Sequence, residues 1–91
     1  MKVFRGYVSD YVRGLDPVEV LRSLSVFKRL LLRLLGYVTV EKILVVTPGG
    51  TRGVVPIYLA KCFSCGELYV DYPHGYDRYV YCPRCGARIY V

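Results

Sequence analysis

Two Cys-x-x-Cys pairs in one short chain constrain its fold more than any other feature. The first pair is Cys62 and Cys65, the second is Cys82 and Cys85, and sixteen residues separate Cys65 from Cys82. A chain of 91 residues buries only about two-thirds of the surface that its unfolded form exposes, so its apolar core leaves a small margin of stability. The cysteines therefore predict a cross-link or a metal ion that supplies the missing stabilisation.

The spacing of the pairs favours a metal ion. Each pair presents two thiolates from one tight turn, and four thiolates complete the tetrahedral shell of Zn²⁺. A glycine follows the second cysteine of each pair, at Gly66 and Gly86, where it permits a positive φ angle. The sequence thus predicts one metal ion, Zn²⁺, with four ligands: Cys62, Cys65, Cys82 and Cys85.

The last third of the chain resembles a zinc ribbon. Strands are predicted at 67–72, 78–82 and 87–91, around a turn at 73–76 and the two cysteine pairs. The resemblance implies a three-stranded antiparallel ribbon around a structural Zn²⁺, and it implies nothing about catalysis. Zinc ribbons occur in transcription factors, RNA polymerase subunits, ribosomal proteins, and small archaeal and archaeal-virus proteins.

Two disulfides are an alternative explanation of the cysteines. The first residues lack the long apolar segment and the cleavage site of a secretory signal peptide. We therefore expect a cytoplasmic location, where thiols stay reduced, and this favours metal over disulfides. The chain contains no Asn or Gln, a composition typical of thermophiles, and in a hyperthermophile cytosol disulfides do persist.

Iron is a second alternative. The segments 62–66 and 82–86, Cys-x-x-Cys-Gly and Cys-Pro-x-Cys-Gly, also resemble rubredoxin, which would imply an iron-binding electron carrier. The net charge of +6 disfavours this alternative, because the surfaces of rubredoxins are acidic. The only histidine, His74, is expected to be a turn residue, since four cysteines already fill the coordination shell.

The residues before the cysteines predict a β-α-β-β unit. Asp16 is a suitable N-cap, Pro17 suits a first helical position and Gly36 suits a helix end, so a single helix is expected from 17 to 35. Residues 2–12 are expected to be extended, with a helical turn as the alternative, because Val8 and Val12 are four residues apart. β-branched residues predict a hairpin of 37–47 and 54–61 with a glycine-rich tip at 48–53. The predicted class is α+β, with a basic sub-domain at 1–59 and a zinc-ribbon sub-domain at 60–91.

The charge favours nucleic acid, or another polyanion, as a partner. Thirteen Lys and Arg outnumber seven Asp and Glu, and residues 1–59 hold most of the excess. Three arginines fall on one side of the expected helix with a lysine at the margin, and another arginine is expected at the hairpin tip; a solvated charge is the alternative for each. The candidate contacts with nucleic acid are Arg22, Lys28, Arg29, Arg33 and Arg52.

The apolar residues of the expected helix spread over about 200° of its circumference, which is wider than one core-facing stripe needs. The excess predicts a homodimer through the helix face, and an alternative function as a protein-interaction or assembly module. Nothing enzymatic is indicated, because the carboxylates are scattered and no phosphate-binding loop or nucleophile motif occurs. No membrane span is expected, since Arg33, Gly36, Glu41 and Lys42 interrupt the longest apolar stretch.

Overall fold

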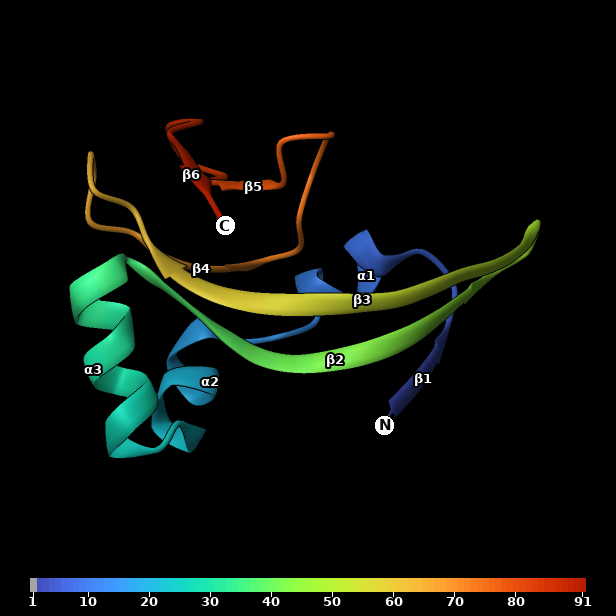
Figure 1. Cartoon of the computed structure of the whole chain (residues 1–91), viewed down its shortest axis with the longest axis horizontal. Helices are drawn as coiled ribbons and strands as arrows, with labels where there is room; N and C mark the ends of the chain where they lie inside the picture. The colour runs from blue at the N-terminus through green and yellow to red at the C-terminus, as the bar shows by residue number, and fades with distance from the viewer. Residues whose placement is uncertain (1) are drawn as a thin grey trace.

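A mixed four-stranded sheet forms the middle layer of the protein (Figure 1). The computed structural model describes residues 2–91. The strands lie in the order β1-β2-β3-β4, with β1 parallel to β2 and the other neighbours antiparallel. Their bounds are Lys2–Arg5 for β1, Tyr37–Thr47 for β2, Gly50–Lys61 for β3 and Leu68–Asp71 for β4.

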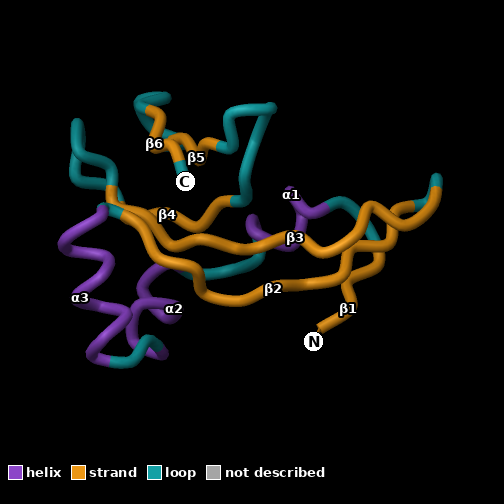
Figure 2. The backbone as a smooth tube through the Cα atoms, viewed as in Figure 1, coloured by secondary structure: helices purple, strands orange, loops and turns teal. Residues whose placement is uncertain are grey.

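Helices cover one face of this sheet and a small hairpin lies over the other, as Figure 2 shows for α2, α3, β5 and β6. Side chains alternate along β3, so Val55, Ile57 and Leu59 pack under the helices, whereas Ala60 packs under the hairpin. The elements of the two outer layers are α1 (Val8–Arg13), α2 (Pro17–Ser23), α3 (Val26–Leu35), β5 (Tyr79–Tyr81) and β6 (Arg88–Tyr90). The class is α+β, as predicted.

The prediction of a single helix over 17–35 is wrong, because the chain leaves the helical conformation at Leu24 and Ser25. The Ser25 side chain accepts a hydrogen bond from the Lys28 backbone N–H at 3.3 Å and caps the start of α3. Serine favours this capping role over a helix interior, and the break lets Leu24 enter the core beside Leu32. Asp16 caps α2 as expected, through the Val18 N–H.

The first residues also depart from the prediction. The segment 2–12 is not wholly extended, since only β1 is a strand and α1 follows it. Val8 is 1% exposed and packs on Ile43 and Val45, so burial of this side chain in a short helix completes the core below β2. The unit therefore runs β-α-α-α-β-β and not β-α-β-β.

The predicted hairpin forms, but its tip is shorter than 48–53. Strands β2 and β3 pair from Thr47 and Gly50 onward, so only Pro48 and Gly49 lie between them. Arg52 consequently lies within β3 and not at the tip. Among residues 2–91 no helix combines the length and the hydropathy needed to cross a membrane.

The three predicted ribbon strands do not form one sheet, because the first of them, 67–72, belongs to the large sheet. Strand β4 pairs with β3, with Tyr58 opposite Asp71, whereas β5 and β6 form a separate two-stranded hairpin. The reason is that the turn after Cys62 reverses the chain directly beside β3, and Val70 then reaches the core under the helices. The division of the chain into 1–59 and 60–91 stays a prediction.

Gly36 is the point at which α3 turns into β2, and a substitution there tests this junction. Its φ of 84° is left-handed, so Gly36→Ala is expected to cost about 1–2 kcal/mol of unfolding free energy. Gly49→Ala is the control, because Gly49 has no positive φ and nothing lies within 4 Å of an added Cβ; its effect should stay within about 0.5 kcal/mol. Urea unfolding measures both values, and equal losses in the two variants would contradict this account.

Candidate metal centre and cationic cleft

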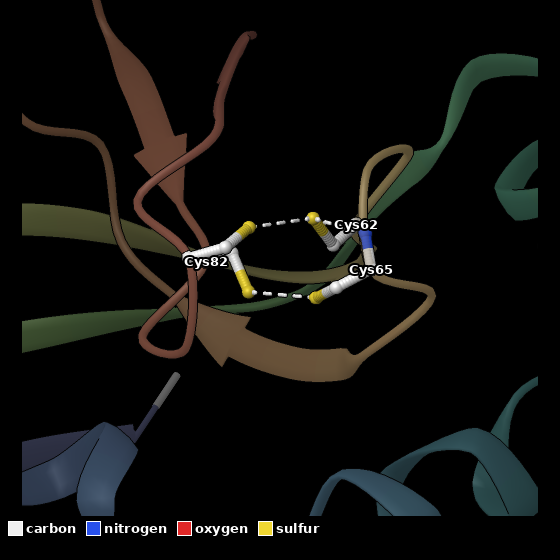
Figure 3. A group of neighbouring side chains, drawn as sticks. Cys62, Cys65 and Cys82 are labelled. Carbon is white, nitrogen blue, oxygen red and sulfur yellow. Dashed lines mark hydrogen bonds between the residues drawn. The ribbon is translucent and has the colours of Figure 1, made fainter.

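Two tight turns bring the four cysteines together. The first turn links β3 to β4 and carries Cys62 and Cys65, and the second links β5 to β6 and carries Cys82 and Cys85. Figure 3 shows Cys62 and Cys65 facing Cys82 across a short gap. The pairs lie far apart in the sequence, so the stacking of the hairpin on the sheet is what makes them neighbours.

The sulfur positions suit one tetrahedral ion. Cys62 Sγ lies 3.3 Å from Cys85 Sγ, Cys65 Sγ lies 3.6 Å from Cys82 Sγ, and all four sulfurs are within 4.8 Å of one another. A Zn–S bond of about 2.3 Å separates the sulfurs of a tetrahedron by about 3.8 Å, so the four thiols need to move only slightly around an ion. They are free thiols, without disulfides among them.

The two turns have the same backbone construction. The Cys62 N–H donates to the Glu67 carbonyl, and the Cys82 N–H donates to the Ala87 carbonyl, at 2.8 and 3.0 Å. The glycines that close the turns, at 66 and 86, both have a φ of 77°, as the sequence predicted. In each turn the first cysteine is buried and the second is exposed. A bound ion would thus have one side against the core and the other near solvent.

The protonation of the thiols shows why the cluster favours a cation. The backbone N–H of Cys65 lowers the pKa of the Cys62 thiol to about 6, against the effect of desolvation. The backbone N–H of Glu67 stabilises the Cys65 thiolate, but desolvation and the neighbouring sulfurs outweigh it and raise the pKa of Cys65 to about 12. One thiolate therefore forms readily at neutral pH, whereas all four ionise together only when a positive charge lies between them.

Asp71 joins the hairpin to the sheet beside the cysteines. This buried carboxylate at the end of β4 accepts hydrogen bonds from His74 Nε2 at 2.9 Å and from the Tyr81 backbone N–H at 3.1 Å. His74 is thus held by Asp71 in the turn before β5 and is not one of the four clustered ligands. Asp71 was not among the predicted site residues, although its position three residues before the histidine was a signal in the sequence.

Four cations line one cleft, which we call the cationic cleft. They are Arg22 from α2, Arg29 and Arg33 from α3, and Lys61 from the end of β3. The cleft encloses about 500 Å³, and in the range 2–91 no carboxylate lines it. The break in the helix does not separate the arginines, because Arg29 Nη2 donates to the Arg22 carbonyl at 3.0 Å.

The charges of the cleft differ in how firmly they are held. Arg22 pairs with Glu19 at 3.3 Å on the surface of α2. Arg33 and Lys61 are exposed and form no ion pair with any residue that the structure describes. Lys61 lines the cleft as well, although it was not among the candidate contacts predicted from the sequence.

The other two candidate contacts lie elsewhere. Lys28 Nζ donates to the Thr39 carbonyl at 3.2 Å, on the side of α3 that faces β2. The Arg52 guanidinium lies 5.4 Å from the centre of the Tyr72 ring and not at a free hairpin tip. Neither residue lines the cationic cleft, so the five predicted residues do not form one surface.

Helix α3 is apolar on the side that faces away from the protein. Val26, Phe27 and Leu34 are 82%, 68% and 71% exposed, and Leu30 between them is half exposed. We call these four residues the outer face of α3. The wide apolar face predicted from sequence is thus divided: one part, including Leu32, enters the core, and the outer face stays uncovered.

No protein-family model matches the chain, and no curated protein or solved structure is significantly similar to it. The site therefore has to be understood from its own geometry. That geometry defines a cluster of four cysteines that can bind a metal ion such as zinc or iron.

Titration of the metal-free protein with Co²⁺ tests the cluster. We expect one ion per chain, with the charge-transfer and ligand-field absorption of tetrahedral thiolate coordination. Cys65→Ser should remove much of this absorption and weaken binding, whereas Ser64→Ala, in the same turn, should bind like the parent protein. A different stoichiometry, or equal binding by the two variants, would contradict the assignment.

Proposed function

We propose that the chain is a non-enzymatic, zinc-stabilised protein that binds nucleic acid through the cationic cleft. The observation that carries the proposal is the gathering of Arg22, Arg29, Arg33 and Lys61 around one concavity without a lining carboxylate. Phosphate contacts by Lys and Arg supply most of the affinity of proteins for nucleic acids. The net charge of +6 adds a long-range attraction in the same direction.

The proposed role of the metal is structural. Four cysteine ligands leave no coordination position open for a substrate, which is the arrangement of structural zinc sites. Binding of Zn²⁺ to such a site contributes on the order of 10 kcal/mol to folding, which is large for a chain of this size. Iron in the same cluster would make the protein a rubredoxin-like electron carrier, and the colour and metal content of the purified protein distinguish the two.

The metal centre and the cleft are adjacent in the backbone. Lys61 immediately precedes the ligand Cys62, and its backbone N–H donates to the Gly36 carbonyl at 2.9 Å, at the end of α3. Coordination of Cys62 would therefore hold the Lys61 backbone at a fixed distance from the arginines of α3. We infer that metal removal weakens nucleic-acid binding without changing any charge in the cleft itself.

The salt dependence of binding to a labelled oligonucleotide tests the proposal. Arg33→Ala with Lys61→Ala should weaken binding and lower the slope of log K against log salt by about one unit for each lost phosphate contact. Lys28→Ala with Arg52→Ala removes the same charge outside the cleft and should leave the slope unchanged. Fluorescence anisotropy measures both. If the two double variants lose affinity and salt slope equally, binding depends on the overall charge and not on the cleft. Absent or salt-independent binding by the parent protein would exclude the function.

The outer face of α3 favours a second candidate function, assembly with another copy of the chain. Val26, Leu30 and Leu34 follow one another at intervals of four residues, so they form one row along the helix. Two such rows in antiparallel contact place Leu30 against its own counterpart, which is the self-complementarity that a two-fold dimer requires. One ten-residue helix per copy is a small interface, so we expect association that depends on concentration.

Light scattering over a range of protein concentrations tests the dimer. Leu30→Glu should produce a monomer, because it places a charge at the centre of the row. Val54→Glu on β3 is the control, since Val54 is 51% exposed and Leu30 is 50% exposed, and it should not affect association. A parent protein that is monomeric at every concentration would exclude this function.

A further inference from the structure

The cationic cleft has an apolar floor. Leu21 from α2, Leu32 from α3 and Leu68 from β4 line it between the charged residues. Its volume of about 500 Å³ lies in the range of about 300–1,000 Å³ that is usual for small-molecule sites. A phosphate group alone would make no apolar contact with these leucines. The cleft therefore fits a ligand that combines an anionic group with an apolar surface.

The floor is part of the core. Leu32 is only 7% exposed and packs with Leu24, Val38 and Leu59, while Leu68 packs against the same cluster. The cleft is therefore backed by a packed interior and does not depend on a mobile loop. Such backing favours a site that keeps its shape when a ligand is absent.

Helix α3 and the tip of the β2–β3 hairpin, the two elements that could enter a groove of a duplex, are unsuited to that role. A helix that reads the major groove needs polar side chains on its outer side, and the outer face of α3 is apolar. The hairpin tip consists of Pro48 and Gly49 and carries no charge, while Arg52 lies over Tyr72. A duplex would also leave the leucine floor empty, because its bases are stacked inside the helix.

We propose that the cationic cleft binds an unpaired nucleotide of single-stranded nucleic acid, with the base against the leucine floor and the phosphates at the cations. The inference rests on the proposed function and narrows it to unpaired strands. An unstacked base has a large apolar face, and contact with that face does not depend on sequence. RNA and DNA share this chemistry.

The contacts within the cleft assign different parts to the cations. Arg22 pairs with Glu19, and Arg29 donates to the Arg22 carbonyl, so both guanidinium groups already have partners within the protein. Arg33 and Lys61 are exposed and have no ion-pair partner in the described part of the chain, which leaves them available for the phosphates on either side of the bound base.

Methyl NMR of the metal-loaded parent protein is the first test. Pentauridylate and pentathymidylate should shift the methyl signals of Leu21, Leu32 and Leu68, and the stronger binder identifies RNA or DNA as the preferred strand. Inorganic phosphate at equal concentration should leave these signals in place. Shifts caused by octyl phosphate but by neither oligonucleotide would overturn the inference in favour of an acyl-type anion.

Competition between strands is the second test. A single strand should bind at least about ten-fold tighter than the duplex of the same sequence. Leu68→Asn should weaken single-strand binding about five-fold or more, because it replaces an apolar contact of the floor by a polar group, whereas Val54→Asn on β3, outside the cleft, should leave it unchanged. Unaltered Co²⁺ absorption verifies that both variants keep the metal centre.

The outcomes separate the inference from the function on which it rests. Equal or tighter binding of the duplex, with Leu68→Asn without effect and Arg33→Ala still weakening, would overturn the inference and leave nucleic-acid binding in place. Failure of both single strand and duplex to bind would overturn the proposed function as well. If Leu68→Asn does not fold, the methyl shifts of the parent protein decide the question.

Discussion

The convergence of four cysteine sulfurs at the junction of two hairpins is the constraint on which the rest of the structure depends. The hairpin of β5 and β6 has two strands of three residues each, which is too short to be stable by itself in water. It lies on the sheet over a small cluster that includes Ala60, Tyr69 and Val80. A cation bound between the two cysteine turns would offset the charge of their thiolates and anchor the hairpin to the sheet, beside the hydrogen bond that the Tyr81 N–H donates to Asp71.

The same junction organises the opposite face of the sheet. Strand β3 ends at Lys61, and the next residue is a sulfur ligand, so the metal centre and the cationic cleft share a backbone segment. The bond from the Lys61 N–H to the Gly36 carbonyl fixes the end of α3 to this segment. A metal ion bound at the cysteines would stabilise one edge of the cleft, because Leu68 of its floor and the turn that carries Cys62 both belong to the hairpin of β3 and β4.

What could be predicted from the sequence depended on local chemistry. Each pair of cysteines and its glycine lies within five residues, so the two turns and their clustering followed from spacing alone. The helix break was missed because the helical spacing of apolar residues continues through Leu24. The break depends on Ser25, whose side chain caps the start of α3. The partner of β4 and the inclusion of Lys61 in the cleft depend on long-range packing, which no local pattern records. The same limit applies to α3: its period predicted an apolar face too wide for the core, but not which leucines stay uncovered.

The central claim is that one ion links the two cysteine turns. X-ray absorption at the metal edge of the purified protein measures this most directly, because it counts the ligand atoms and gives their distances. Four sulfurs at about 2.3 Å from Zn²⁺ would agree with the arrangement of Cys62, Cys65, Cys82 and Cys85. A shell that contains nitrogen or oxygen, or a protein that binds no metal and stays folded, would contradict it.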